Sequence, residues 1–116
     1  MRVIPRKLEG TFEIFPKVFS DERGFFMETY HKLRYMNELN IKTNLVQLNF
    51  SKSKYAVLRG LHFQKKFPQA KLIRAVKGKI FDVVVDLRKD SKTYLEWDSI
   101  ILDGEKFNQF WVPEGF

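Results

Sequence analysis

Short apolar runs separated by turn-forming residues make up most of this sequence, and that pattern constrains the fold more than any other feature. Residues 11–19 (TFEIFPKVF) and 24–30 (GFFMETY) are rich in Phe and other strand formers, with the polar sequence SDER between them. Runs of this kind bounded by polar turns are typical of β-strands joined by loops. We therefore predict a pair of strands in this region.

A single segment has helical spacing. In residues 30–40 (YHKLRYMNELN), apolar side chains recur at helix-like intervals, at Tyr30, Leu33, Met36 and Leu39. This spacing places them on one face of a helix. Asn40 is a suitable cap just past the helix end, because Asn tolerates the left-handed conformation. We predict one short helix.

Residues 45–51 (LVQLNFS) alternate between apolar and polar side chains. Period-two alternation is typical of a strand with one buried and one solvated face. The apolar face would carry Val46, Leu48 and Phe50, and the polar face would carry Gln47 and Asn49.

Residues 70–88 predict a β-hairpin about Lys77-Gly78, because glycine accepts the positive φ that tight hairpin turns require. Two further strands are expected, at residues 93–102 and 107–113, across a second turn at Asp103-Gly104. Many short antiparallel strands with one helix predict an all-β sandwich or barrel. The core face of the second hairpin strand would carry Phe81, Val83, Val85 and Leu87.

The length and composition fit one domain. With 116 residues, 44% of them hydrophobic, the chain is long enough for a single core and too short for two ordinary ones. It has no Cys, which excludes disulfides and thiolate metal sites and indicates a reducing compartment. No apolar run approaches the length of a membrane-spanning helix and the N-terminus lacks a signal-peptide core, so we expect a cytoplasmic protein.

The formal net charge of +7 predicts an anionic partner. Lys and Arg are scattered in ones and twos, without a block of like charges, which disfavours nucleic acid and membranes as partners. The final residues, FWVPEGF at 110–116, stop directly after a strand and a turn signal. Either a partner covers this edge or the single domain, residues 1–116, is incomplete at its C-terminus.

His62 lies in an apolar run, LRGLHFQ at residues 58–64, three positions after Arg59. An imidazole is the side chain best suited to remove and return a proton at neutral pH. The alternative is a core histidine satisfied by a backbone carbonyl. A bulge at Gly60 would bring Arg59 and His62 to one side of a strand; otherwise Arg59 lies on the surface. His31, among basic residues, is expected to be exposed.

The predicted hairpin places Lys71 on the same face as Asp82 and Asp86. An acidic neighbour keeps a lysine charged, and a fixed ammonium can stabilise a developing oxyanion. The alternative is an exposed ion pair worth ~0–1 kcal/mol. Gln47 and Asn49 present amides either to a ligand or to solvent.

Metal chemistry is disfavoured by the residues available. The chain has two His and no His-x-His pair, and it contains no Cys. It also lacks a glycine-rich phosphate loop of either common spacing and a Ser/His/Asp motif.

Four long stretches carry most of these features. They are FSDERGFFMETY at 19–30, VQLNFSKSKYAVLRGLHFQ at 46–64, QAKLIRAVKGKIFDVVVDLRKDS at 69–91 and FWVPEGF at 110–116. In this order they resemble the dTDP-4-dehydrorhamnose 3,5-epimerase family over nearly the whole chain. The resemblance implies a jelly-roll cupin barrel that works as a homodimer without metal or organic cofactor. It also implies epimerisation at C3 and C5 of dTDP-4-dehydro-6-deoxy-D-glucose, giving dTDP-4-dehydro-L-rhamnose, in dTDP-L-rhamnose biosynthesis.

The same resemblance implies residue roles. His62 would remove the proton from carbon, Lys71 would hold the enolate oxygen at the C4 ketone, and Arg59 would bind the ligand close to that centre. Arg23 would reach across from the partner subunit. The remaining substrate-binding residues would be Glu28, Gln47, Leu48 and Asn49, and Leu48 stands where the family often has Asp.

Family members continue past PEGF with strands that bring a tyrosine acid and an aspartate partner for the catalytic histidine. Neither lies within these residues, and none of the four tyrosines falls at the acid's position, so we expect the isolated chain to turn over slowly. Three alternatives stay open. They are a single-carbon epimerase, a 3,4-ketoisomerase on the same nucleotide sugar, and a non-catalytic nucleotide-sugar-binding module.

Overall fold

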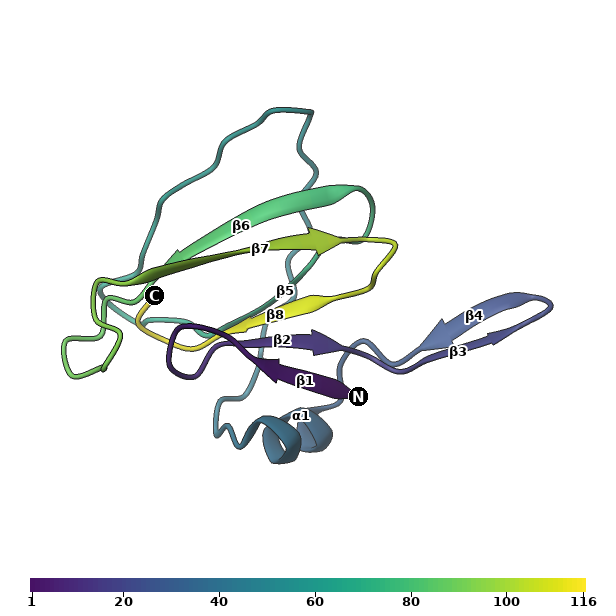
Figure 1. The fold of residues 1–116 in the computed structure, drawn as a ribbon, viewed down its shortest axis with the longest axis horizontal. Helices are drawn as coiled ribbons and strands as arrows, with labels where there is room; N and C mark the ends of the chain where they lie inside the picture. The colour runs from purple at the N-terminus through teal and green to yellow at the C-terminus, as the bar shows by residue number, and fades with distance from the viewer.

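The computed structural model describes residues 1–116 and consists of antiparallel β-strands with one helix (Figure 1). The strands form a four-stranded sheet in the order β1-β2-β8-β5 and two two-stranded sheets, β3-β4 and β6-β7. The predicted all-β class with one short helix is confirmed. No helix in this fold has the length and apolar character needed to cross a bilayer. The elements are β1 (Arg2–Pro5), β2 (Phe12–Phe15), β3 (Val18–Asp21), β4 (Gly24–Met27), α1 (Lys32–Leu39), β5 (Lys71–Arg74), β6 (Lys79–Val85), β7 (Trp97–Asp103) and β8 (Gln109–Val112).

Strand β8 lies between the two parts of the core, and all four of its residues are buried. Because side chains alternate along a strand, Phe110 and Val112 join one apolar cluster and Trp111 joins the other. The first cluster also contains Leu8, Ala75, Val84, Ile100 and Leu102. The second contains Ile14, Tyr35 and Leu39. Burying each large apolar side chain contributes about 1.5–3 kcal/mol.

The helix confirms the prediction in position and corrects it in orientation. Asn40 adopts the left-handed conformation (φ 51°), as expected for the residue past the end, and the exposed His31 caps the first turn through its side chain. The buried pair is Tyr35 and Leu39, four residues apart, whereas Leu33 is 63% exposed. The buried face of the helix is therefore rotated about the helix axis relative to the predicted face.

The first predicted strand pair is confirmed in part. Strands β3 and β4 form a hairpin around the SDER turn, with Val18 opposite Met27, and the hairpin projects away from the other sheets (Figure 1). The run at 11–19 is not one strand, because Pro16 separates β2 from β3. As a result β2 joins the large sheet and only β3 pairs with β4.

The predicted hairpin about Lys77-Gly78 is wrong. Strand β5 pairs with β8, with Lys71 opposite Val112, and β6 pairs with β7. The intervening residues 75–78 instead carry the chain from one sheet to another, and Ala75 is buried at this corner. A glycine turn of this length is compatible with both arrangements, so local sequence does not decide between them.

The predicted core face of β6 is also wrong. Val84 is the strand's buried apolar residue, whereas Phe81 is 68% exposed. The alternation was read correctly but assigned to the wrong side, because the side of Val84 also carries Asp82 and Asp86. Asp86 is nevertheless completely buried.

Residues 41–70 contain no helix or strand, so the predicted strand at 45–51 is wrong. They run as a long irregular loop away from the sheets (Figure 1), and residues 42–70 make no backbone–backbone hydrogen bond. Ile41, Leu45 and Ala70 anchor the two ends of the loop against the second core cluster. Between these anchors most side chains are exposed, and Leu48 is 96% exposed. The alternation is present, but the chain offers no neighbouring strand to pair with it.

The buried phenol of Tyr35 joins α1 to β8. Its Oη donates to Gln109 Oε1 at 2.8 Å and contacts the Thr29 carbonyl oxygen at 3.1 Å, and Gln109 Nε2 donates to the same carbonyl at 2.8 Å. Burial raises the pKa of Tyr35 to about 12, although the hydrogen bond with Gln109 opposes the shift. The hydroxyl is therefore a neutral donor throughout the physiological range.

We predict that Tyr35→Phe lowers the free energy of unfolding by about 1–3 kcal/mol, because Gln109 Oε1 loses its donor inside the protein. Urea denaturation at pH 7 measures the difference. Tyr30→Phe is the matched control, since the Tyr30 ring packs 5.1 Å from that of Tyr35 but its hydroxyl has no hydrogen bond. Equal stability of the two variants would contradict the role given to the Tyr35 hydroxyl.

Candidate functional site

Arg23 and Glu28 flank strand β4 at the projecting hairpin. The Arg23 side chain is 90% exposed, and its guanidinium contacts Asp21 at 2.6 Å and 3.2 Å. The side-chain hydrogen bond from Arg23 lowers the pKa of Asp21, and the Arg23 backbone N–H lowers it further. Glu28 pairs with Arg34 of α1 at 2.9 Å. Arg23 is thus presented outward at a hairpin tip, while Glu28 is held against the helix.

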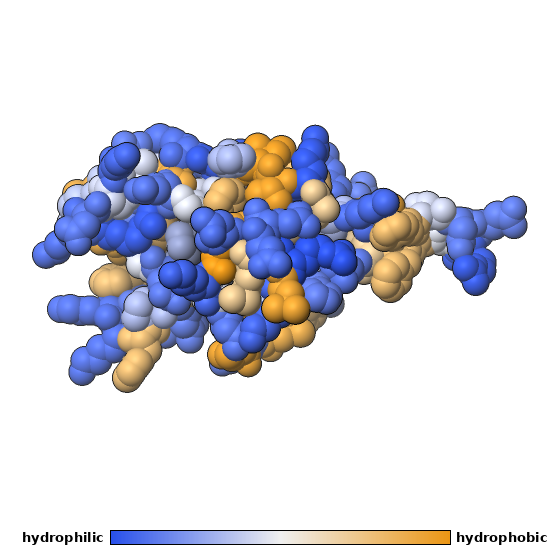
Figure 2. Space-filling view, turned by 90° about the horizontal axis from the view of Figure 1, so that it is seen from below, coloured by the Kyte–Doolittle hydropathy of each residue, from blue (hydrophilic) through white to orange (hydrophobic).

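The hairpin also carries exposed aromatic side chains. Phe19, Phe25 and Phe26 are 51%, 56% and 69% exposed. Figure 2 shows apolar atoms gathered between the body of the molecule and the polar tip of this hairpin. The hairpin therefore presents an apolar surface next to a cation.

Gln47, Leu48 and Asn49 lie in the long loop and are exposed. Gln47 Nε2 donates to Asn49 Oδ1 at 2.9 Å, so the two amides lie on the same side, as period-two spacing requires. Their expected placement on one polar face is retained even though no strand forms.

Arg59 folds back onto its own loop. Its guanidinium donates to Ser53 Oγ at 3.1 Å and to the Lys52 carbonyl oxygen at 3.3 Å. The expected bulge at Gly60 is wrong, because residues 41–70 form no ladder that a bulge could interrupt. Gly60 has a different role. Its φ is +117°, a backbone conformation that L side chains rarely adopt, so this position requires glycine.

His62 is exposed and makes no hydrogen bond or ion pair. The alternative of a core histidine satisfied by a backbone carbonyl is therefore wrong for this chain. The ring is accessible to a ligand from solvent.

Lys71 begins β5 and is exposed, and it acts electrostatically on Asp82 of β6. Burial raises the pKa of Asp82, while the Lys71 charge and the Val83 backbone N–H oppose that shift. The expected proximity of Lys71 and Asp82 is thus retained, although it arises between sheets rather than within a hairpin.

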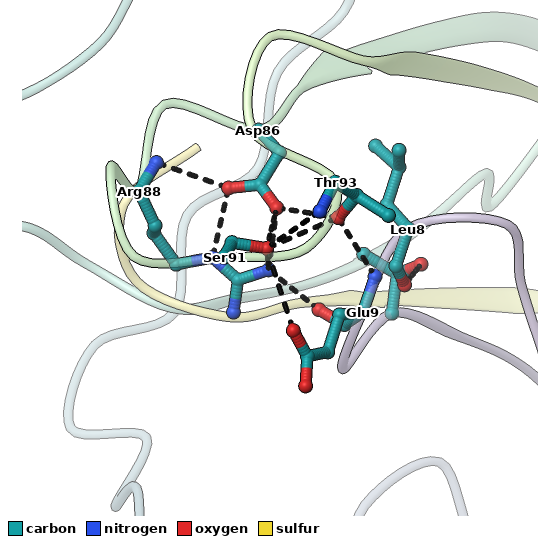
Figure 3. Close-up of polar contacts among 7 residues, drawn as sticks. Leu8, Glu9, Asp86, Arg88, Ser91 and Thr93 are labelled. Atoms are coloured by element: carbon teal, nitrogen blue, oxygen red, sulfur yellow. Dashed lines mark hydrogen bonds and ion pairs between the residues drawn. The ribbon is translucent and has the colours of Figure 1, made fainter.

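Asp86 does not share the environment of Lys71, and that part of the prediction is wrong. It is completely buried and accepts hydrogen bonds from Arg88, Ser91 and Thr93 (Figure 3). The Asp86 carboxylate lies 2.7 Å from an Arg88 nitrogen, 2.6 Å from Ser91 Oγ and 2.7 Å from Thr93 Oγ1. Burial by itself would raise the pKa of Asp86, but the hydrogen bonds together hold it well below its usual range.

The Asp86 network joins distant segments of the chain. Arg88 also donates to the Glu9 carbonyl oxygen at 2.7 Å, and its guanidinium lies 4.6 Å from the centre of the Phe116 ring. The Leu87 N–H donates to the Gly115 carbonyl oxygen at 3.0 Å. The network thus fixes the β1–β2 turn and residues 115–116 to the end of β6.

One feature of the candidate site was missed in the sequence. Between Glu38 and Asp82 there is no acidic residue, whereas this stretch contains ten Lys and Arg residues, all of them exposed. It includes six of the candidate site residues: Gln47, Leu48, Asn49, Arg59, His62 and Lys71. Counting charges by segment rather than over the whole chain would have revealed it.

The structure brings only some candidate residues together. Gln47 and Asn49 are in contact, but Arg23, Arg59 and His62 make no hydrogen bond or ion pair with another candidate residue. A cavity of about 150 Å³ lies elsewhere, at the base of the β3–β4 hairpin. It is lined by Phe25, Met27, Arg74, Ala75, Val76, Gly104 and Phe107.

The chain as a whole is similar to one family of known proteins. Residues 5–116 match the family model described as dTDP-4-dehydrorhamnose 3,5-epimerase. A protein of that name from Methanothermobacter thermautotrophicus is 49% identical over 115 residues, which cover 99% of this chain and 62% of the relative. A dTDP-4-dehydrorhamnose 3-epimerase from Streptomyces niveus is 40% identical over 116 residues, covering 99% of this chain and 56% of the relative.

A solved structure agrees with these relatives. The crystal structure of dTDP-6-deoxy-D-glucose-3,5-epimerase from Legionella pneumophila, in complex with dTDP-4-keto-L-rhamnose, matches with a TM-score of 0.94 and 44% identity. The match covers 99% of this chain and 61% of that one. The fold is thus the one found in cupin-type nucleotide-sugar epimerases. Within that class, the chain belongs to the dTDP-4-dehydrorhamnose 3,5-epimerase family. It spans 62% of the length of the Methanothermobacter relative.

We predict that Lys71→Met raises the pKa of Asp82 further above its ordinary value, because the variant removes a charge that opposes the effect of burial. A carboxyl ¹³C NMR titration of Asp82 measures the shift. Lys42→Met, which removes an exposed charge from the long loop, should leave this pKa unchanged. An unchanged pKa in Lys71→Met would show that the ammonium does not act on Asp82.

We predict that Asp86→Asn lowers the free energy of unfolding at pH 7 by about 3 kcal/mol, because it breaks a buried ion pair. This loss is at the lower end of the range for such pairs because Arg88 stays partly exposed. The folded-state pKa of Asp86 is depressed, so the carboxylate's contribution is complete above the unfolded pKa of about 4 and is lost as pH falls below it. Urea denaturation from pH 7 to pH 3 tests both statements. The exposed Asp90→Asn is the control, and equal losses in both variants would refute the assignment.

Proposed function

We propose that this chain carries the proton-transfer part of a nucleotide-sugar epimerase. The reaction is the conversion of dTDP-4-dehydro-6-deoxy-D-glucose to dTDP-4-dehydro-L-rhamnose by inversion at C3 and C5, in dTDP-L-rhamnose biosynthesis. The observation that carries the proposal is 49% identity to a 3,5-epimerase over 99% of the chain. The complex of the Legionella enzyme with dTDP-4-keto-L-rhamnose supports the substrate class.

The chemistry requires a base and an oxyanion partner. A hydrogen on the carbon beside a ketone becomes acidic only if the enolate that forms is stabilised, so a proton acceptor and a cation must act together. We assign the proton acceptor to His62, whose imidazole is exposed and free of hydrogen bonds. We assign the stabilisation of the enolate oxygen to the ammonium of Lys71, which is exposed at the start of β5 and acts electrostatically on Asp82.

The nucleotide part of the substrate would be bound by residues around this pair. Arg59 and the acid-free stretch supply positive charge for the diphosphate. Gln47 and Asn49 offer amides from one side of the loop, with Leu48 between them. Glu28, already held by Arg34, would complete the set.

We further propose that the protein acts as a homodimer in which Arg23 enters the site of the partner subunit. The projecting β3–β4 hairpin supports this, since it combines an exposed cation at its tip with an apolar surface. Exposed aromatic side chains next to Arg are characteristic of interface residues. The cytoplasmic location and the absence of a metal requirement remain predictions from the sequence.

The acid that returns the proton is not assigned to any tyrosine of this chain. Tyr35 is unsuitable because its hydroxyl is buried, already donates to Gln109, and has a pKa raised to about 12.

A single-carbon epimerase is the second candidate function. The Streptomyces niveus relative is named a 3-epimerase and matches 99% of this chain, so similarity across these residues does not distinguish one inversion from two. Deuterium found at C3 alone after reaction in D2O would favour this candidate. A moved carbonyl would indicate a 3,4-ketoisomerase, and dTDP binding without exchange would indicate a binding module.

We predict that the chain exchanges deuterium into C3 of dTDP-4-dehydro-6-deoxy-D-glucose in D2O, and that His62→Asn slows this exchange by ~10²–10⁴-fold because the base is lost. NMR of the recovered sugar measures the rate. His31→Asn should exchange at the unaltered rate, since His31 lies at the helix start. Exchange at full rate in His62→Asn would refute the assignment of the base.

A further inference from the structure

Arg59 is held in place by uncharged groups. Its Nε–H donates to Ser53 Oγ at 3.1 Å, and its Nη2 donates to the Lys52 carbonyl oxygen at 3.3 Å. By contrast, four other guanidiniums each contact a carboxylate, those of Arg6, Arg23, Arg34 and Arg88. A carboxylate partner offsets the charge of an arginine, whereas a hydroxyl and a carbonyl fix its direction and leave the charge available to a ligand.

The two contacts use one edge of the Arg59 guanidinium. The group is planar, with Nε and Nη2 donating along one edge and Nη1 and Nη2 along another. Ser53 and Lys52 accept from the first edge. The second edge makes no hydrogen bond or ion pair, and the residue is exposed. A free edge of this kind can donate in parallel to two oxygens of a phosphate group.

A turn in the loop makes the contact with Ser53 possible. Tyr55 and Ala56 form this turn, and Ala56 has a positive φ of 59°, which is uncommon for a residue with a Cβ. Arg59 thereby meets residues six and seven positions earlier in the chain. Because this segment makes no backbone–backbone hydrogen bond, the two contacts of Arg59 are the hydrogen bonds that close the turn.

We propose that Ser53 is a positioning residue for the diphosphate of the substrate, a role that rests on the proposed function. Its hydroxyl and the Lys52 carbonyl hold the Nε–Nη2 edge of Arg59 and leave the Nη1–Nη2 edge free for two diphosphate oxygens. An arginine on an irregular loop loses rotamer freedom when it binds a ligand. Ser53 restricts that freedom before the ligand arrives, so the entropy lost on binding is smaller.

The first test detects the contact without any ligand. Nitrogen-15 NMR measures how fast the Arg59 Nε–H exchanges with water, and a hydrogen-bonded N–H exchanges more slowly than a free one. Ser53→Ala should accelerate this exchange ~3- to 10-fold, and Ser53→Thr, which keeps a hydroxyl, should restore the slow rate. Thr43→Val removes a hydroxyl elsewhere in the loop and should leave the rate unaltered. Equal rates in all four proteins would overturn the proposal.

The second test uses inorganic pyrophosphate as the probe and titration calorimetry as the measurement. Ser53→Ala should weaken binding ~3- to 10-fold, while Ser53→Thr and Thr43→Val should bind normally. In the Arg59→Lys background, Ser53→Ala should change the affinity by less than about twofold, because the donors of an ammonium rotate and present no fixed edge. An equal loss in both backgrounds would overturn the proposal, since Ser53 would then act independently of Arg59.

Kinetics separate positioning from general damage to the loop. In the deuterium-exchange assay, Ser53→Ala should raise KM ~3- to 10-fold and leave kcat within about twofold, because the diphosphate is bound equally in the ground state and the transition state. A damaged loop would displace His62 and lower kcat, and that result would overturn the positioning role.

Failure of this proposal is distinguishable from failure of the proposed function. Absence of deuterium exchange in the unaltered protein would refute the proposed reaction, and the NMR and pyrophosphate measurements would still decide the role of Ser53. Failure of the unaltered protein to bind pyrophosphate would refute the diphosphate assignment and this proposal with it. Normal pyrophosphate binding by Ser53→Ala would refute the role of Ser53 alone.

Discussion

The pairing of β8 with both β2 and β5 is the interaction on which the rest of the structure depends. This strand is buried at every residue, and its alternation divides the interior between Trp111 on one side and Phe110 and Val112 on the other. The helix is held through Gln109, and the corner at Ala75 packs against the same strand's apolar face. Disruption of β8 would therefore remove core residues from both apolar clusters at once.

Sequence patterns predicted the types of secondary-structure element well and the pairing partners of the strands poorly. The helix and its Asn40 cap depend on residues within one turn, so local spacing was sufficient. The pairing of β5 with β8 depends on residues far apart in the chain, and a glycine turn could not distinguish a hairpin from a corner. The face of β6 was misassigned because the hydrogen bonds that bury Asp86 come from Arg88, Ser91 and Thr93, which periodicity does not report.

For the candidate site too, the sequence predicted which residues are involved better than it predicted how they are arranged in space. Residue types and family resemblance named His62, Lys71 and Arg59, but their spatial relation depends on strands that the local sequence does not encode. The network around Tyr35 joins helix α1 to strand β8, and the network around Asp86 lies in the connection between β6 and β7. The candidate ligand-binding residues lie mainly on the irregular loop and the projecting hairpin, where exposure to a ligand is greatest. The hydrogen-bond networks that stabilise the fold and the candidate ligand-binding residues thus lie mainly in different segments of the chain.

The acid-free stretch between Glu38 and Asp82 also affects how fast a ligand arrives. A surface with cations and no anions produces an attractive potential that extends about 8–10 Å at physiological ionic strength. A diphosphate would be drawn toward the loop before any specific contact forms, which raises the encounter rate. The same potential does not distinguish a nucleotide sugar from inorganic phosphate or sulfate. Phosphate buffer would therefore slow ligand capture both by screening and by occupying the same cations.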